Sequence, residues 1–162
     1  MARSRTLSGL EEVMARVTKC FEAGAMATGS RLVLTAEQPY AEMRQDADIT
    51  RTYVANAAAI GRQATEMTPE IFRRAFSTDM GNVSQAIPSI HPGISLDCYP
   101  DGNHQPEFAA HSVSAAGDRA VLDGALLMAW TAIDVASETS TRARLLASPY
   151  RAAGDQTRPS ED

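Results

Sequence analysis

The residues with types and spacing suited to chemistry gather between positions 77 and 108. This stretch holds the polar string Ser77–Ser84, the pair His91-Pro92 and the run Asn103–Phe108. It is too polar for a protein core and too rich in Gly, Pro and Asn for regular structure. Restricted loops that carry Ser, Thr, Asp, Asn and His are typical of binding and catalytic sites. The pattern therefore predicts a functional loop region, with a plain turn region as the alternative.

Single residues in this stretch admit both chemical and structural roles. The chain has three His, and none lies in H-x-D, H-x-H or H-E-x-x-H, so local spacing shows no complete metal site. Asp79 suits a site residue or an Asx-type turn. Gly81 suits a positive φ or a close approach of two backbones. We attribute His111 to packing or exposure beside the last long helix.

Composition excludes several classes of function. The 162 residues carry a net charge of −5, with a pI of about 5.2. This charge argues against non-specific nucleic-acid binding and against a polybasic membrane patch. We find no run of 18 apolar residues and no apolar signal sequence at the start, so we expect no membrane span and a cytoplasmic protein. Its two Cys are then expected to be free thiols.

Hydrophobic periodicity predicts three helices, over residues 7–27, 46–61 and 118–137. Thr6, or a capping box of Ser8 and Glu11, begins the first helix, and Gly29 suits its end. The third is apolar nearly all round, which predicts burial between two layers.

Alternating residues predict strands over 31–35 and 94–98. With residues 1–6 as a further short strand, the first 36 residues would form a β-α-β piece. A sheet of two strands is only marginally stable in water. From residue 139 onward the chain is polar, and we expect a disordered tail over 139–162.

The polar segments also carry a family resemblance. The string S-T-D-x-G-N-V-S (77–84), then P-x-I-H-P (88–92) and N-H-x-x-E-F (103–108), resembles the C-terminal part of the zinc hydrolases that include aminoacylase, glutamate carboxypeptidase and p-aminobenzoyl-glutamate hydrolase, peptidase family M twenty. Residues 3–7 and 20–29 resemble the end of that family's lid, or dimerisation, domain. The resemblance covers about residues 2–137 and is most specific at 77–84.

The resemblance implies an α/β fold of two domains, a catalytic domain with an inserted α/β lid. Residues 1–36 would be the C-terminal half of the lid, and 37–138 the C-terminal part of the catalytic domain. The family's members bind two zinc ions and hydrolyse an amide bond next to a free carboxylate. Substrates of this class are N-acyl amino acids and dipeptide-like molecules.

The resemblance also implies roles for four residues. His104 matches the family's metal ligand near the C-terminus, and a neutral imidazole is a good zinc donor. Asp79, Gly81 and Asn82 match a loop beside the active site and would contact substrate. We assign no catalytic residue within this chain.

Most of the machinery that the family uses is not found in this sequence. The H-x-D metal pair, the bridging Asp, the Glu pair with the general base and the remaining ligand have no counterpart in it. We therefore expect a C-terminal fragment of an amidohydrolase, inactive alone and with apolar surface that promotes association. Its partner would be a second copy or the missing N-terminal half. The alternatives are a non-catalytic interaction module and one half of a split enzyme.

Overall fold

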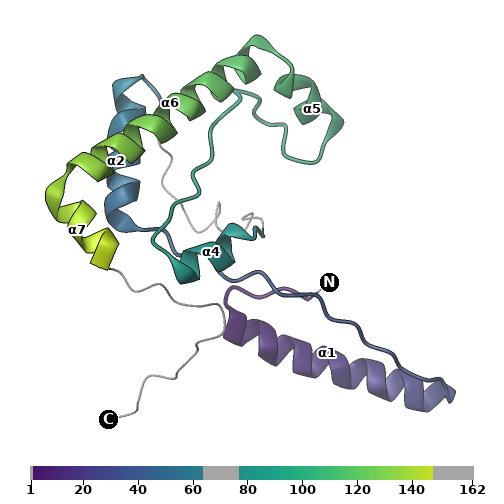
Figure 1. Ribbon diagram of the computed structural model, residues 1–162. Helices are drawn as coiled ribbons and strands as arrows, with labels where there is room; N and C mark the ends of the chain where they lie inside the picture. Colours follow the sequence, from purple (N-terminus) through teal and green to yellow (C-terminus); the bar gives the residue numbers. More distant parts are fainter. Residues whose placement is uncertain (1, 64–76, 148–162) are drawn as a thin grey trace. The chain divides into compact units, whose positions relative to one another are not determined.

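The computed structural model describes residues 2–63 and 77–147, and these divide into two compact units (Figure 1). The first unit contains residues 2–44 and 77–86, and the second contains 45–63 and 87–147. The described chain is mostly helical, and its β structure is one isolated parallel bridge, Gln45–Ser89. The expected α/β architecture is therefore not confirmed. The predicted domain boundary after residue 36 stays a prediction.

The first unit begins with helix α1, Leu7–Thr28, which confirms the helix predicted over 7–27. The Thr6 hydroxyl oxygen accepts a hydrogen bond from the Gly9 N–H at 3.2 Å, so Thr6 is the N-cap and the Ser8 capping box is not formed. Gly29 ends the helix in the left-handed conformation, with φ 64°. Glycine adopts this conformation without the steric cost of a Cβ, as predicted.

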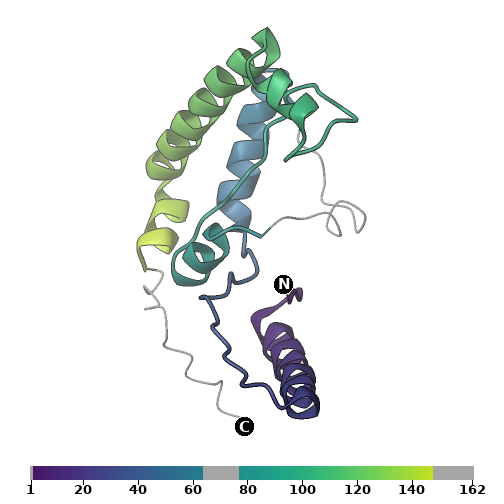
Figure 2. The same cartoon turned by 90° about the vertical axis from the view of Figure 1, so that its right-hand side faces the viewer.

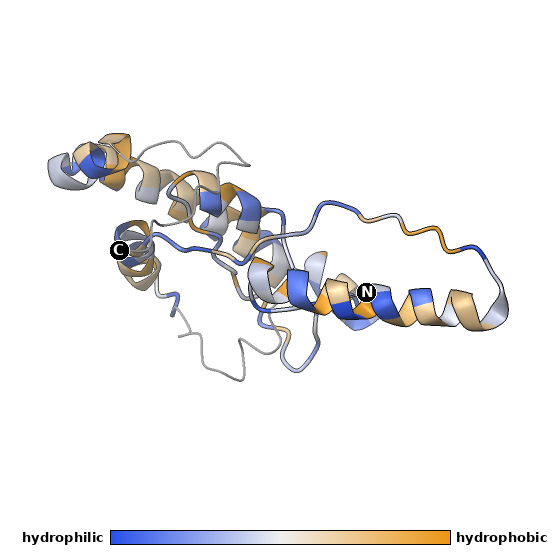
Figure 3. Cartoon of the chain, turned by 90° about the horizontal axis from the view of Figure 1, so that it is seen from below, coloured by the Kyte–Doolittle hydropathy of each residue, from blue (hydrophilic) through white to orange (hydrophobic). Residues whose placement is uncertain are grey.

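The segment after α1 forms no strand, so the expected β-α-β piece is wrong for the described chain. A strand is stable only when a second strand satisfies its N–H and C=O groups, and residues 31–35 have no such partner among the described residues. The apolar stripe of α1 has no buried residue. Figure 3 shows the apolar stretch after α1 in orange, lying outside any sheet. Several large apolar side chains of this unit are exposed: Phe21, Met26, Val33 and Leu34.

The second unit is built around two helices that lie side by side, α2 (Ala47–Ala59) and α6 (Ala115–Ser137), as Figures 1 and 2 both show. These confirm the helices predicted over 46–61 and 118–137. Its small core consists of Tyr53, Ala57 and Leu127, with Ile60, Ile90 and Ile94 partly buried against it.

Polar side chains on α2 and just after it reinforce this packing. Asn56 donates from Nδ2 to the Asp134 carboxylate at 2.8 Å. Arg62 pairs with Asp123 at 2.8 Å and donates to the main-chain oxygen of Ser95 at 2.9 Å. The segment 94–98, predicted as a strand, is thus attached to the helices by a side chain and forms no strand.

Helix α6 is buried on one side and open on the other. Gly117, Ala120, Leu127 and Thr131 are buried, whereas Val121 and Leu122 are each 71% exposed. The expected burial of this helix between two layers is therefore not found, because within the described chain only one side of α6 is covered. Among the described residues α6 alone is long and apolar enough to cross a membrane, but core helices of soluble proteins pass the same test.

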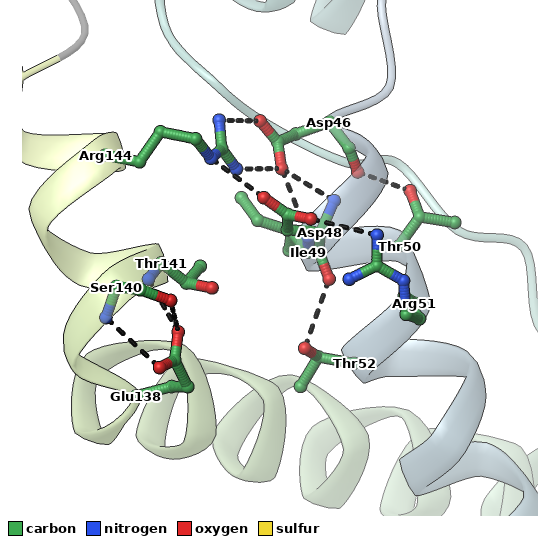
Figure 4. Close-up of polar contacts among 10 residues, drawn as sticks. All are labelled: Asp46, Asp48, Ile49, Thr50, Arg51, Thr52, Glu138, Ser140, Thr141 and Arg144. Atoms are coloured by element: carbon green, nitrogen blue, oxygen red, sulfur yellow. Dashed lines mark hydrogen bonds and ion pairs between the residues drawn. The ribbon is translucent and has the colours of Figure 1, made fainter.

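Two further helices, α5 (Pro106–Ser112) and α7 (Thr139–Ala147), lie in the described part of this unit. The expected disorder from residue 139 is wrong as far as Ala147, and residues 148–162 lie outside the described chain. Glu138 begins α7, because its carboxylate accepts hydrogen bonds from the N–H groups of Ser140 and Thr141 and from the Ser140 hydroxyl (Figure 4). These donors stabilise the charged form and lower the pKa of Glu138 to about 2, with the Thr141 bonds as the largest cause.

An ion-pair network attaches α7 to the start of α2 (Figure 4). Arg144 makes a two-pronged pair with Asp46, at 3.0 and 2.8 Å, and contacts Asp48 at 2.8 Å. Asp46 is also the N-cap of α2 and accepts from the N–H groups of Asp48 and Ile49 at 3.1 Å. The Arg144 hydrogen bond lowers the pKa of Asp46 below its ordinary 3.8, although burial opposes the shift.

Replacement of Asp46 should expose the two roles of its carboxylate. We expect Asp46→Ala to destabilise the chain by about 1 kcal/mol at pH 7, a typical loss for an N-cap. Asp46→Asn keeps an acceptor for the cap and removes the charge that Arg144 binds. The lowered native pKa means that the charge stabilises the fold above pH 3.8 and that this contribution is lost as the pH falls through the native pKa. In urea denaturation series, the difference in the free energy of unfolding between wild type and Asp46→Asn should therefore decrease below pH 3.8. A difference that does not change with pH would contradict this account.

Candidate functional site

The predicted substrate loop lies at the start of helix α4, Met80–Ala86, in the first unit. The Thr78 hydroxyl accepts from the Met80 N–H at 3.3 Å and donates to the Asp79 carboxylate at 3.4 Å. The Asp79 carbonyl accepts from the N–H groups of Asn82 and Val83, at 2.9 and 3.3 Å. The Asp79 side chain is exposed. Its backbone thus starts the helix while its carboxylate faces solvent.

Gly81 and Asn82 lie against another part of the chain. The Asn82 amide binds the main chain twice, since Oδ1 accepts from Ala41 N–H at 2.6 Å and Nδ2 donates to Pro39 C=O at 3.2 Å. A Cβ at Gly81 would overlap the carbonyl oxygen of Ala41. Of the two roles considered for Gly81, close backbone approach is therefore confirmed, and its φ is not positive.

Two more side chains of α4 bind the same segment. The buried Ser84 hydroxyl accepts from the Arg44 N–H at 2.8 Å and donates to the Gly81 carbonyl at 2.7 Å. The Gln85 side chain donates to the Glu42 carbonyl at 2.7 Å. We refer to Asn82, Ser84 and Gln85, together with Gly81, as the α4 clamp on residues 39–44. Sequence reasoning missed Gln85 and the clamp, whose sole sequence signal was the density of polar residues in this string.

The clamped segment also reaches α1. The Glu42 carboxylate accepts from the Leu7 N–H at 3.0 Å, at the first turn of that helix. An acid at a helix N-terminus satisfies a free N–H and interacts favourably with the helix dipole. The polar string therefore holds the first unit together, which gives most of it a structural use.

His104 lies in the second unit, two residues before α5. It is exposed and has φ 68°, a left-handed conformation that is uncommon for residues other than glycine. Among the described residues its ring makes no hydrogen bond. Beside it, the Gln105 side-chain oxygen accepts from the Gly102 N–H at 3.1 Å.

His111 makes a contact that the sequence did not predict. Its Nε2 lies 3.1 Å from a carboxylate oxygen of Asp101, and both side chains are partly exposed. The sequence held no signal for this pair, because the two residues are ten positions apart on opposite sides of a turn. His91 lies in the same unit and binds Gln45 through its backbone N–H at 3.0 Å.

The described residues do not make a zinc site on their own. No group of three or more His, Cys, Asp or Glu side chains gathers in the described ranges 2–63 and 77–147. His104 offers one imidazole donor, whereas a protein zinc site needs three or four ligands. The three residues of the predicted substrate loop lie in the first unit and His104 lies in the second.

Two mammalian dipeptidases are similar to this chain. The Xaa-Arg dipeptidase of Mus musculus is 28% identical over 136 residues, which are 82% of this chain and 31% of that protein. The Xaa-Arg dipeptidase of Homo sapiens is 25% identical over 134 residues, 82% of this chain and 30% of that protein. No family model and no solved structure matches.

These similarities indicate a distant relationship to peptidases. The chain spans about a third of the length of the curated relatives it matches. The peptidase side of the family resemblance is thus supported.

The α4 clamp can be tested at Gly81. We expect Gly81→Ala to destabilise the chain by about 1–3 kcal/mol, because the added methyl group must displace the Ala41 backbone. Gly24→Ala is the matched control, since a Cβ there meets nothing within 4 Å and an interior helical Gly costs about 0.5–1 kcal/mol relative to Ala. Chemical denaturation should thus show opposite signs for the two variants. Equal effects would contradict the close approach.

Proposed function

We propose that this chain is the C-terminal segment of a metal-dependent amidohydrolase of the aminoacylase and carboxypeptidase type. The reaction of the whole enzyme would be hydrolysis of an amide bond in dipeptide-like or N-acyl amino acid substrates. The observation that carries the proposal is the 28% identity to Xaa-Arg dipeptidase over 82% of this chain. Dipeptides that end in Arg are accordingly the first substrates to try.

His104 would be one donor to a pair of zinc ions, with the other ligands and the general base supplied from outside this chain. Its exposed ring makes no hydrogen bond among the described residues, so the imidazole is available as a ligand. By contrast, Cys20 and Cys98 form no disulfide, and the resemblance assigns neither of them a metal-binding role. With one donor and no partner ligands, we expect the chain alone to be inactive.

Within the substrate loop the three residues would contribute in different ways. Asp79 presents an exposed carboxylate and is the member best placed to contact substrate directly. The amide of Asn82 is already bound to Pro39 and Ala41, and Gly81 packs on Ala41. These two would shape the loop rather than touch the substrate.

A second candidate, a non-catalytic interaction module, is favoured by the exposed apolar surface. On α6, Leu122 and Ile133 are 71% and 61% exposed, and exposed apolar surface commonly binds other polypeptides. The same surface serves the first proposal, since half of a split enzyme or a second copy would cover it. We propose a protein partner and a cytoplasmic location, with no membrane and no nucleic acid bound.

Purified chain should show no zinc-dependent turnover. We expect background rates with Xaa-Arg dipeptides, N-acyl amino acids and p-aminobenzoyl-glutamate, measured with and without added zinc, and less than one zinc per chain by elemental analysis. An Xaa-Arg dipeptidase assayed in parallel provides the positive control. Robust turnover by this chain alone would contradict the proposal that the other zinc ligands and the general base lie outside this chain.

The DNA next to the codon for Met1 separates the two candidates. The hydrolase proposal expects a reading frame there that encodes an H-x-D pair and adjacent glutamates. Unrelated sequence at that place would favour the interaction module.

Association through α6 should be visible in solution. We expect size-exclusion chromatography with light scattering to give a mass above the 17.4 kDa of one chain. The double variant Leu122→Glu and Ile133→Glu should shift the mass toward 17.4 kDa, because charge on an apolar contact is costly to bury. Val113→Glu, at an exposed apolar residue outside α6, is the control that should leave the mass unchanged. A sharp two-state melt of a wild-type monomer would contradict this prediction.

A further inference from the structure

The outward side of α6 is apolar and carries no charge. Between residues 120 and 137 the sequence has two charged side chains, and both bind toward α2. Asp123 pairs with Arg62 at 2.8 Å. Asp134 accepts from Asn56 Nδ2 at 2.8 Å. The large side chains on the other side of the helix are apolar and exposed: Val121, Leu122, Met128 and Ile133. A helix that turns its charges inward and its apolar residues outward indicates a surface that another polypeptide covers.

Charges of opposite sign lie at the two ends of this apolar face. Asp118 is exposed in the first turn of α6. At the other end the exposed Arg142 side chain donates to the Ala136 carbonyl at 2.7 Å, so a cation lies beside the last turn. Asp118 and Ala136 are separated by five helical turns of 3.6 residues and therefore lie on the same line along the helix. The residues close to this line between them are apolar: Leu122, Ala125, Ala129 and Ala132.

We propose that this face of α6 binds the same face of a second copy of the chain, with the two helices antiparallel. Such a pair places each Asp118 beside the partner's Arg142, so that opposite charges meet at both ends of the contact. A parallel pair would instead bring the two Asp118 carboxylates together at one end and the two Arg142 side chains together at the other. Charge complementarity therefore selects the antiparallel orientation. The contact is the same on both copies, as a two-fold axis requires.

The charge contacts also determine the register of the two helices. They place the two-fold axis at the level of Leu127, midway along the apolar face. Leu122 then faces the partner's Ala132, and Ala125 faces the partner's Ala129. A large side chain opposite a small one lets two helices pack closely without a void. The sequence of α6 is thus complementary to itself in the orientation that its terminal charges select.

The charges of the chain favour a second copy over a lipid surface as the occupant. Helices that lie on membranes carry Lys and Arg on their polar side, whereas the polar side of α6 carries Asp123 and Asp134. The whole chain has a net charge of −5, which anionic headgroups repel. This inference rests on the protein partner proposed for α6 and adds its identity and orientation. It does not depend on the hydrolase activity.

Analytical ultracentrifugation of the full chain tests the charge contacts. We expect wild type to form a dimer, with twice the 17.4 kDa of one chain. Asp118→Arg should raise the dimer Kd about tenfold, because it places like charges at both ends of the contact. The double variant Asp118→Arg with Arg142→Asp should restore the wild-type Kd. Glu12→Arg, at an exposed acid of α1, makes the same change in net charge and should leave the Kd unchanged.

Cysteine cross-linking tests the orientation without changing a charge. In a chain with Cys20→Ser and Cys98→Ser, Leu122→Cys is introduced in one sample and Ala132→Cys in a second, isotope-labelled sample. In a mixture of the two, mass spectrometry should find the mixed disulfide several-fold in excess over either symmetric one. In the antiparallel pair, equal positions of the two copies lie ten residues apart along the helix, about 15 Å, which is beyond the reach of a disulfide. An excess of symmetric disulfides would show a parallel pair and overturn the proposal.

The remaining outcomes separate this inference from the proposed function. A wild-type monomer overturns the second copy as occupant, whatever the turnover assays show. A dimer whose Kd does not respond to Asp118→Arg overturns the antiparallel pair and leaves the association itself standing. A monomer that floats with vesicles of phosphatidylcholine and phosphatidylserine identifies a lipid surface as the occupant and overturns the proposal. Thermal melts identify variants that do not fold, and if the double charge variant is one of them, the cross-linking result decides.

Discussion

The first unit depends on the binding of main-chain groups by side chains. Residues 39–44 belong to no helix or strand, yet their N–H and C=O groups need partners wherever water is excluded. Asn82, Ser84 and Gln85 provide these partners from one short helix. The segment so fixed directs Glu42 to the N-terminus of α1. A helix with no buried residue of its own is thereby attached through hydrogen bonds, which have directional requirements that apolar contacts lack.

The second unit combines a small apolar core with charged contacts at the helix ends. Leu127 is its one large side chain that is fully buried within the described residues, so hydrophobic packing alone leaves the helix ends weakly held. Asp46 binds the start of α2 and the Arg144 side chain at once, and Glu138 begins α7 in an orientation that brings Arg144 there. These N-terminal caps therefore do more than begin helices, because they also bring α7 to the start of α2.

The sequence predicted what depends on neighbours along the chain and missed what depends on distant residues. The apolar periods of α1, α2 and α6 are local, and all three helices were found. A strand at 31–35 needs a partner that periodicity cannot supply. Helix α4 was interpreted as loop because its polar residues suggested solvent or ligand, whereas they bind a segment about 40 positions away. His104 was selected by resemblance, whereas the contact between Asp101 and His111 required coordinates.

The two parts of the family resemblance carry different weight for function. The string around Asn82 is the more specific match. However, the Asn82 amide and the Ser84 hydroxyl bind the main chain of residues 39–44 and so hold the fold. A shared fold does not imply shared chemistry, so residues that hold the fold together are weak evidence of function. His104 is different, because its exposed ring makes no hydrogen bond among the described residues and its backbone is in a costly conformation. The hydrolase proposal therefore takes His104 as its candidate donor, while the observation that carries the proposal is the 28% identity to Xaa-Arg dipeptidase over 82% of this chain.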